Sequence, residues 1–146
     1  MSEYCITCCS TADMPASYFE ENQIPYTCFH FMLDGKEYPD DLGKTVPFDK
    51  FYQMITDGAQ PTTAQVNTEQ YAQLFESVLK QGKDVLHLTL SSGISGTYNS
   101  ANLARMQMEE KYPDRKIFVI DSLAASSGYG LLVDQALENQ KNGMSL

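Results

Sequence analysis

The sequence predicts an α/β fold in which a mostly parallel sheet carries helices on both of its faces. Short apolar runs with strand-like alternation are separated by stretches with helical spacing, and this order of elements is typical of parallel sheets. The strand-like runs cover residues 4–9, 24–33, 84–90 and 116–120. A chain of 146 residues, 42% of them hydrophobic, can bury one respectable core, so we expect a single domain spanning residues 1–146.

The first half is expected to begin with a buried strand and a short helix capped by Asp13. A second strand, a hairpin that turns at Asp34-Gly35 and another helix follow. These elements are expected at residues 4–9, 13–22, 24–33, 34–38 and 48–55. The chain then enters a loop rich in hydroxyl groups, Gln60 to Gln65.

In the second half, Asn67 and Gln70 have the spacing of a capping box, which predicts a helix from there to Gln81. The remaining elements are a strand, a turn, a helix, a strand and a final helix. They are expected at residues 84–90, 91–97, 99–110, 116–120 and 128–141. Ligands of parallel sheets bind beyond the carboxyl ends of the strands, so the loops that follow the strands are the candidate site.

The turn from Ser91 to Thr97 has the chemistry of an anion site. It exposes backbone N–H groups at the positive end of a helix dipole, and hydroxyl groups such as that of Ser95 add further donors. Gly93 and Gly96 let a ligand approach the backbone. The alternative is structural, because hydroxyl groups also cap helices and glycines also shape turns.

The charge of the chain excludes some partners. A formal charge of -9 with only 10 basic residues argues against nucleic acid and against an anionic membrane surface. No segment is long and apolar enough to span a membrane, and nothing marks export, so we expect a cytoplasmic protein. There is no phosphate loop and no dinucleotide fingerprint, and the sequence implies no cofactor.

Four cysteines fall in the first 28 residues and raise the question of a metal site. They are Cys5, Cys8, Cys9 and Cys28. Along a strand, Cys5 and Cys9 would share one face and Cys8 the other, and no second pair of ligands follows at zinc spacing. We therefore predict structural thiols that bind no metal.

The segment Ser91-Ser-Gly-Ile-Ser-Gly-Thr-Tyr-Asn-Ser-Ala101 resembles the signature of the DegV family, bacterial fatty-acid-binding proteins that serve as lipid-presenting subunits of fatty acid kinase. Weaker matches occur in the right order along essentially the whole chain. They are residues 6–15, 33–38, 61–65 and 119–122.

The resemblance implies that Thr63 and Ser95 donate hydrogen bonds to the carboxylate of a long-chain fatty acid. It also implies that a kinase subunit phosphorylates this carboxylate with ATP, while the present protein only holds the lipid. Family members continue into a second domain that covers the acyl chain, and residues 1–146 are expected to be the N-terminal domain alone. We expect that domain to bind fatty acid weakly and to expose an apolar patch.

The sequence departs from the family pattern at four places. They are Cys9 for an aspartate, Cys28 for a proline, Ala64 for a serine and Val66 for a proline. Two other functions stay open. A hydrolase would use Ser95 as nucleophile with His87 or Asp121 in support, although the Gly-x-Ser-x-Gly elbow is absent. A pure interaction module would need no ligand.

Overall fold

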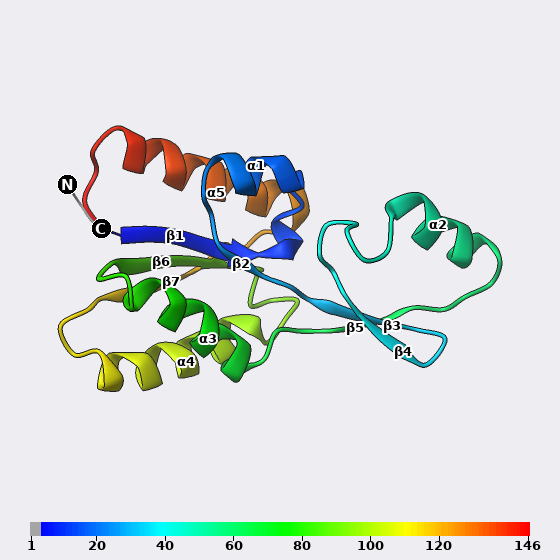
Figure 1. Ribbon diagram of the computed structural model, residues 1–146, viewed down its shortest axis with the longest axis horizontal. Coiled ribbons are helices and arrows are strands. Elements are labelled where there is room, and N and C mark those ends of the chain that lie inside the picture. Colours follow the sequence, from blue (N-terminus) through cyan, green and yellow to red (C-terminus); the bar gives the residue numbers. More distant parts are fainter. Residues whose placement is uncertain (1–3) are drawn as a thin grey trace.

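The computed structural model describes residues 4–146 and contains two sheets (Figure 1). The larger sheet has four parallel strands in the order β2-β1-β6-β7. The smaller sheet is antiparallel, in the order β4-β3-β5. The strands are β1 (Tyr4–Cys9), β2 (Tyr26–Thr27), β3 (His30–Leu33), β4 (Lys36–Pro39), β5 (Thr62–Ala64), β6 (Asp84–Thr89) and β7 (Ile117–Asp121).

Helices cover both faces of the parallel sheet, as the sequence predicts. Two helices, α1 (Ala16–Glu21) and α5 (Ser126–Lys141), lie on one face, and α3 (Thr68–Leu79) and α4 (Thr97–Lys111) lie on the other (Figure 1). A 3₁₀ turn, η1 (Ser10–Ala12), follows β1. None of the helices within residues 4–146 combines the length and the apolar composition needed to cross a bilayer.

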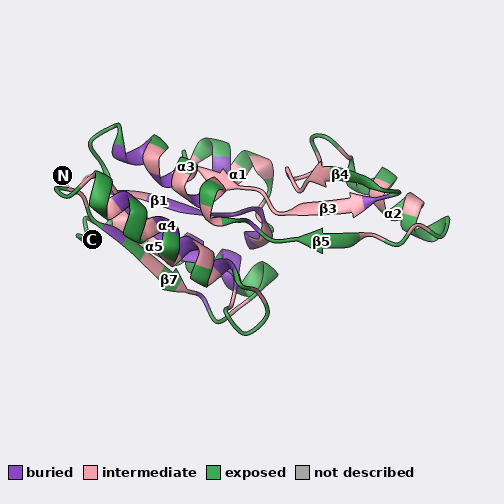
Figure 2. Ribbon diagram, turned by 90° about the horizontal axis from the view of Figure 1, so that it is seen from below, coloured by how far each residue is buried: buried purple, intermediate pink, exposed green. Residues whose placement is uncertain are grey.

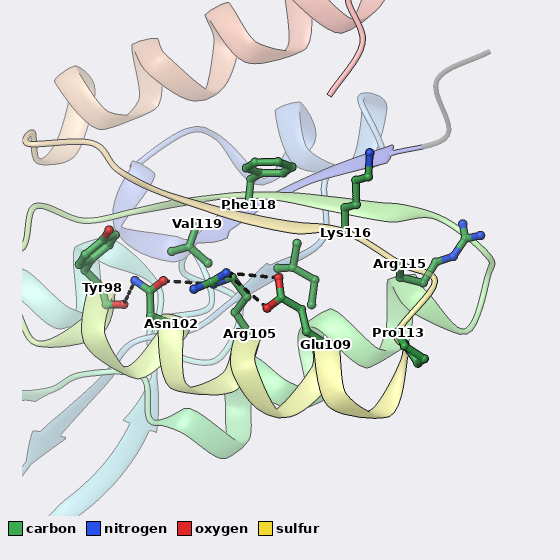
Figure 3. A pocket seen from close by; sticks show the side chains of 10 residues that line it. Tyr98, Asn102, Arg105, Glu109, Pro113, Arg115, Lys116, Phe118 and Val119 are labelled. Carbon is green, nitrogen blue, oxygen red and sulfur yellow. Dashed lines mark hydrogen bonds and ion pairs between the residues drawn. The ribbon is translucent and has the colours of Figure 1, made fainter.

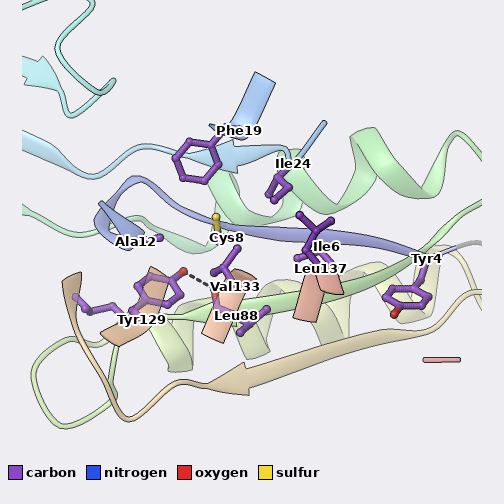
Figure 4. Close-up of a cluster of buried hydrophobic side chains, with 11 residues drawn as sticks. Tyr4, Ile6, Cys8, Ala12, Phe19, Ile24, Leu88, Tyr129, Val133 and Leu137 are labelled. Carbon is purple, nitrogen blue, oxygen red and sulfur yellow. Dashed lines mark hydrogen bonds between the residues drawn. The ribbon is translucent and has the colours of Figure 1, made fainter. Parts of the chain in front are cut away.

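The central strand β1 is buried on both faces because a helical layer covers each. Cys8 packs in the cluster under α1 and α5, which Figure 4 shows, whereas Cys9 packs in the cluster under α3 and α4. This confirms the strand alternation predicted for the thiols. The continuous apolar run of the strand reflects a sheet with two covered faces.

Tyr129 fastens α5 to the two central strands. Its hydroxyl donates a 2.6 Å hydrogen bond to the carbonyl of Leu88 (Figure 4). The same hydroxyl accepts a 3.0 Å hydrogen bond from the amide of Cys9. The next residue is Gly130, where a Cβ atom would lie 2.6 Å from the carbonyl oxygen of Ala12. Only glycine therefore allows α5 to pack this closely on η1.

Helix α3 follows directly from its sequence. Asn67 and Gln70 form the predicted capping box, with both reciprocal hydrogen bonds present. The helix buries a stripe of side chains at helical spacing against the sheet. They are Tyr71, Phe75, Val78 and Leu79.

The prediction of a single second strand from Ile24 to Leu33 is wrong. It divides into β2, which pairs with β1 in the parallel sheet, and β3, which belongs to the antiparallel sheet. The single apolar run is thus shared between two sheets, because the chain leaves the first at Cys28. Thr62–Ala64, predicted as loop, pairs with β3 as an edge strand.

Three helix starts also differ from prediction, one of them that of α5, which begins at Ser126 rather than at residue 128. Asp13 does not cap α1; it ends η1 in a left-handed conformation with φ 52°, and Pro15 is the N-cap residue. Helix α4 begins at Thr97 with Gly96 as its N-cap, two residues before the predicted start. Asp13 belongs to the turn that ends η1, and Thr97 and Tyr98 belong to the helix rather than to the turn before it.

Strands β3 to β5 and helix α2 (Phe48–Thr56) project from the parallel-sheet domain as an arm, defined here as residues 30–64 (Figure 1). The arm is mostly half-buried or exposed (Figure 2). Helix α2 has no buried residue, and β5 is exposed throughout.

Candidate functional site

The turn after β6 places a helix N-terminus at the carboxyl end of the parallel sheet. The amides of Ile94 and Ser95 both donate to the carbonyl of Ser91 at 3.1 Å, which folds the turn back on itself. Helix α4 then begins at Thr97, and its N-cap residue, Gly96, has no side chain that could cap the helix. Such a terminus offers N–H donors to an acceptor from elsewhere.

That acceptor is Gln65, the residue that directly follows the arm. Its Oε1 atom accepts a 2.8 Å hydrogen bond from the amide of Gly96 and one of 3.2 Å from the hydroxyl of Ser95. The Ser95 hydroxyl in turn accepts a 3.3 Å bond from the amide of Thr97. Two neutral donors therefore converge on one oxygen atom at the helix N-terminus.

Thr63 lies two residues before Gln65, on the exposed edge strand β5, where it pairs with Phe31. It also lines a cavity of about 300 Å³ where the arm meets η1. The Phe and Tyr side chains that line this cavity are Phe29, Phe31, Phe48, Phe51 and Tyr52. The hydrogen bonds of Gln65 thus join the loop that contains Thr63 to the turn that contains Ser95. That Thr63 and Ser95 bind the same carboxylate stays a prediction.

Asp121, at the end of the neighbouring strand β7, holds the turn in place through hydrogen bonds. Its Oδ1 atom accepts hydrogen bonds from the amides of Ser92 at 3.0 Å and Leu123 at 3.1 Å. Burial raises the pKa of Asp121, but the hydrogen bonds from Ser92 and Leu123 outweigh it and lower the pKa below its ordinary value. Its carboxylate is thus held in place as part of the scaffold.

His87 lies inside the core rather than beside Ser95. Its Nδ1 atom is 2.8 Å from the hydroxyl of Thr7, and its ring packs edge-on against Tyr71 and Phe75. Burial lowers its pKa to about 3, so the ring is neutral. Within residues 4–146 the hydroxyl of Ser95 bonds only Gln65 and Thr97, so the contact between nucleophile and base that a hydrolase needs does not form.

Cys9, which replaces the aspartate of the family pattern, turns its thiol into the core. Its sulfur lies 3.0 Å from the hydroxyl of Tyr71, and burial raises its pKa to about 12 despite that hydrogen bond. A protonated thiol of this kind packs as a small apolar group. Within the described residues no cluster of three His, Cys, Asp or Glu side chains could hold a metal.

A second groove, of about 520 Å³, lies between α4 and β7 (Figure 3). Three of its polar side chains bond one another: Arg105 bonds Asn102 at 3.3 Å and Glu109 at 3.2 Å. Thr63 and Ser95 do not line it. The groove therefore plays no part in the predicted head-group site.

Gln65 is the site residue that sequence reasoning missed. It lies in the hydroxyl-rich loop predicted to face the ligand, but its role depends on a contact with Gly96, 31 positions further along the chain. Its signals were its place at the end of that loop and within residues 61–65, one of the segments that resemble the family pattern.

Comparison with known proteins settles the family. The model of "Uncharacterised protein, DegV family" matches residues 5–146. The chain belongs to the DegV family. A DegV domain-containing protein of Clostridium perfringens is 38% identical over 146 residues, which are 100% of this chain and 50% of the relative.

Solved DegV-like structures agree with the fold. A stearic-acid-binding protein from Eubacterium ventriosum superposes with a TM-score of 0.89 at 33% identity, over 98% of this chain and 49% of that one. A DegV family protein from Thermus thermophilus, solved for its fatty acid binding, gives 0.84 at 31% identity, over 99% and 49%. The chain spans about half the length of the relatives it matches.

Proposed function

We propose that this chain binds a long-chain fatty acid through its carboxylate, with Thr63 and Ser95 as hydrogen-bond donors. The observation that supports this most is the convergence of the Ser95 hydroxyl and the Gly96 amide on one acceptor oxygen at the start of α4. A carboxylate oxygen has the same acceptor geometry and gains from the helix dipole as well. The fatty acids bound by related DegV proteins supply the ligand class.

The site is suited to holding a reactive carboxylate. The turn from Ser91 to Thr97 and the loop from Gln60 to Gln65 contain no Lys or Arg, so the ligand would meet only neutral donors. Such donors hold an anion without a salt bridge that would reduce its nucleophilicity. Because the whole chain carries a formal charge of -9, affinity must come mainly from burial of the acyl chain.

The bound lipid is then presented to a fatty acid kinase subunit. One carboxylate oxygen attacks the γ-phosphorus of ATP, the bond to the β–γ bridging oxygen breaks, and ADP leaves with an acyl phosphate as the product. The kinase supplies the phosphoryl-transfer machinery, and this chain supplies a held and exposed carboxylate. Use of ATP places the encounter in the cytoplasm.

Housing of the acyl chain requires more surface than the head-group site provides. The cavity beside Thr63, at about 300 Å³, is at the lower end of ordinary ligand pockets. Large apolar side chains are also exposed on β7, on α5 and between them: Phe118, Ile120, Leu123 and Leu131. A second half like that of the longer relatives would cover such surface and the lipid tail.

The head-group assignment is tested by titrating a fluorescent fatty acid into Ser95→Ala and Thr63→Val. Each removes one donor to a charged acceptor, so each should weaken binding by about tenfold or more. Thr62→Val is the matched control, because adjacent side chains of a strand point to opposite sides, and it should bind as the wild type does. Unchanged affinity in both Ser95→Ala and Thr63→Val would refute the assignment.

Two further measurements test the remaining steps. Acyl phosphate formed with kinase subunit and ATP can be trapped by hydroxylamine, and its absence with lipid-loaded protein would contradict presentation. A full-length relative, such as the Clostridium perfringens protein, should bind oleate more tightly than residues 1–146. Equal affinities would show that this chain houses the whole tail.

A further inference from the structure

The carboxamide of Gln65 occupies the position that the proposed function gives to a ligand oxygen. Its Oε1 atom accepts from the Gly96 amide at 2.8 Å and from the Ser95 hydroxyl at 3.2 Å. A carboxamide oxygen and a carboxylate oxygen are both planar acceptors, so the same two donors can serve either. They cannot serve both at once with the same geometry.

The contact is also close in space. A Cβ atom built on Gly96 would lie 2.9 Å from Nε2 and 3.0 Å from Oε1 of Gln65. The carboxamide therefore lies against the backbone of the turn and fills the approach that glycine leaves open. A ligand oxygen can reach the Gly96 amide only after Gln65 has moved away.

The side chain of Gln65 can move without disturbing the core. It is exposed, and it directly follows β5, an edge strand with three exposed residues. Moving it costs two neutral hydrogen bonds, which water can replace at the surface. The exchange of Gln65 for a ligand is therefore reversible and inexpensive.

We propose that Gln65 is an internal competitor that closes the head-group site when no fatty acid is bound and so sets the affinity of that site. This inference rests on the proposed function. When the competent open state is only a fraction of the population, the apparent dissociation constant rises by the inverse of that fraction. A carboxylate displaces the carboxamide because charge-assisted hydrogen bonds are roughly twice as strong as neutral ones.

The test is titration of oleate into the wild type and two variants. Gln65→Ala removes the competitor and should tighten binding by about 3-fold to 10-fold, the worth of the lost hydrogen bonds. Gln65→Glu makes the competitor charged and should weaken binding by about 10-fold or more. Gln60→Ala, an exposed glutamine of the same loop without a side-chain hydrogen bond within residues 4–146, should bind as the wild type does.

A measurement without lipid isolates the hydrogen bond itself. In the ligand-free protein the amide of Gly96 should exchange with solvent faster in Gln65→Ala than in the wild type, followed by NMR. Equal exchange rates would contradict the closed site. This readout does not depend on whether the ligand class is right.

The outcomes separate the two proposals. Weaker or unchanged oleate binding by Gln65→Ala, with wild-type binding intact, would overturn the competitor role and leave the proposed function standing. Failure of the wild type and of Gln65→Ala alike to bind any long-chain fatty acid would overturn both.

Discussion

Helix α3 buries four side chains against the parallel sheet, whereas α2 buries none against the sheet of the arm. The parallel-sheet domain is held by two large apolar clusters, one on each face of its sheet. The arm is held by half-buried aromatic pairs, with centroids 5.5 Å apart for Phe31 and Tyr38 and 5.1 Å for Phe31 and Phe51. Regions with so few buried contacts open locally at a small cost in free energy.

The proposed head-group site lies where these two regions meet. Ser95 and Gly96 belong to the firmly packed domain, whereas Thr63 lies at the end of the arm and Gln65 directly follows it. The difference in packing means that one half of the site is fixed while the other half can adjust. The following predictions test that difference.

The largest effect is expected from a core truncation compared with an arm truncation. Phe75→Ala removes a fully buried ring and should lower the free energy of global unfolding by about 3–5 kcal/mol. Phe51→Ala removes only aromatic pairs and should cost about 1–2 kcal/mol, mostly as local opening of the arm. Denaturant melts and hydrogen exchange measure both, and a comparable global loss for Phe51→Ala would show that the arm unfolds with the domain.

A pH-dependent effect, of intermediate size for each pH unit, is expected at His87. Its pKa is about 3 in the folded chain, below the ordinary 6.5, so the unfolded chain alone takes up a proton as the pH falls below 6.5. Stability from this group should decline by about 1.4 kcal/mol per pH unit between 6.5 and 3.

The measurement compares wild type with His87→Leu. The variant should lose this contribution to the slope of unfolding free energy against pH, although it also leaves the Thr7 hydroxyl without its partner at every pH. Parallel curves for the two proteins would show that His87 takes up a proton in the folded state as readily as in the unfolded state.

The smallest effect is expected at the capping box of α3, a device that α2 lacks because its N-cap is Pro47. Asn67→Ala should cost about 1 kcal/mol, since one helix N–H loses its acceptor. Gln73→Ala, an exposed position in the middle of the same helix, should change stability by less than about 0.5 kcal/mol. Thermal or denaturant unfolding distinguishes the two variants.

Features that depend on near neighbours could be predicted from the sequence. The capping box of Asn67 and Gln70 joins residues three positions apart, and the alternation of Cys8 and Cys9 follows from strand geometry alone. The α/β fold follows from the order of such local patterns. The turn from Ser91 to Thr97 was likewise visible as a strand-to-helix junction.

The tertiary structure decided what depends on distant partners. One apolar run, Ile24 to Leu33, could pair in either sheet, and its division was fixed by the strands available on each side. The acceptor at the start of α4 is Gln65, because folding of the arm carries it to a donor 31 residues away. Periodicity and capping are encoded over a few residues, whereas the partner of an exposed hydrogen-bonding group is set only when the whole chain has packed.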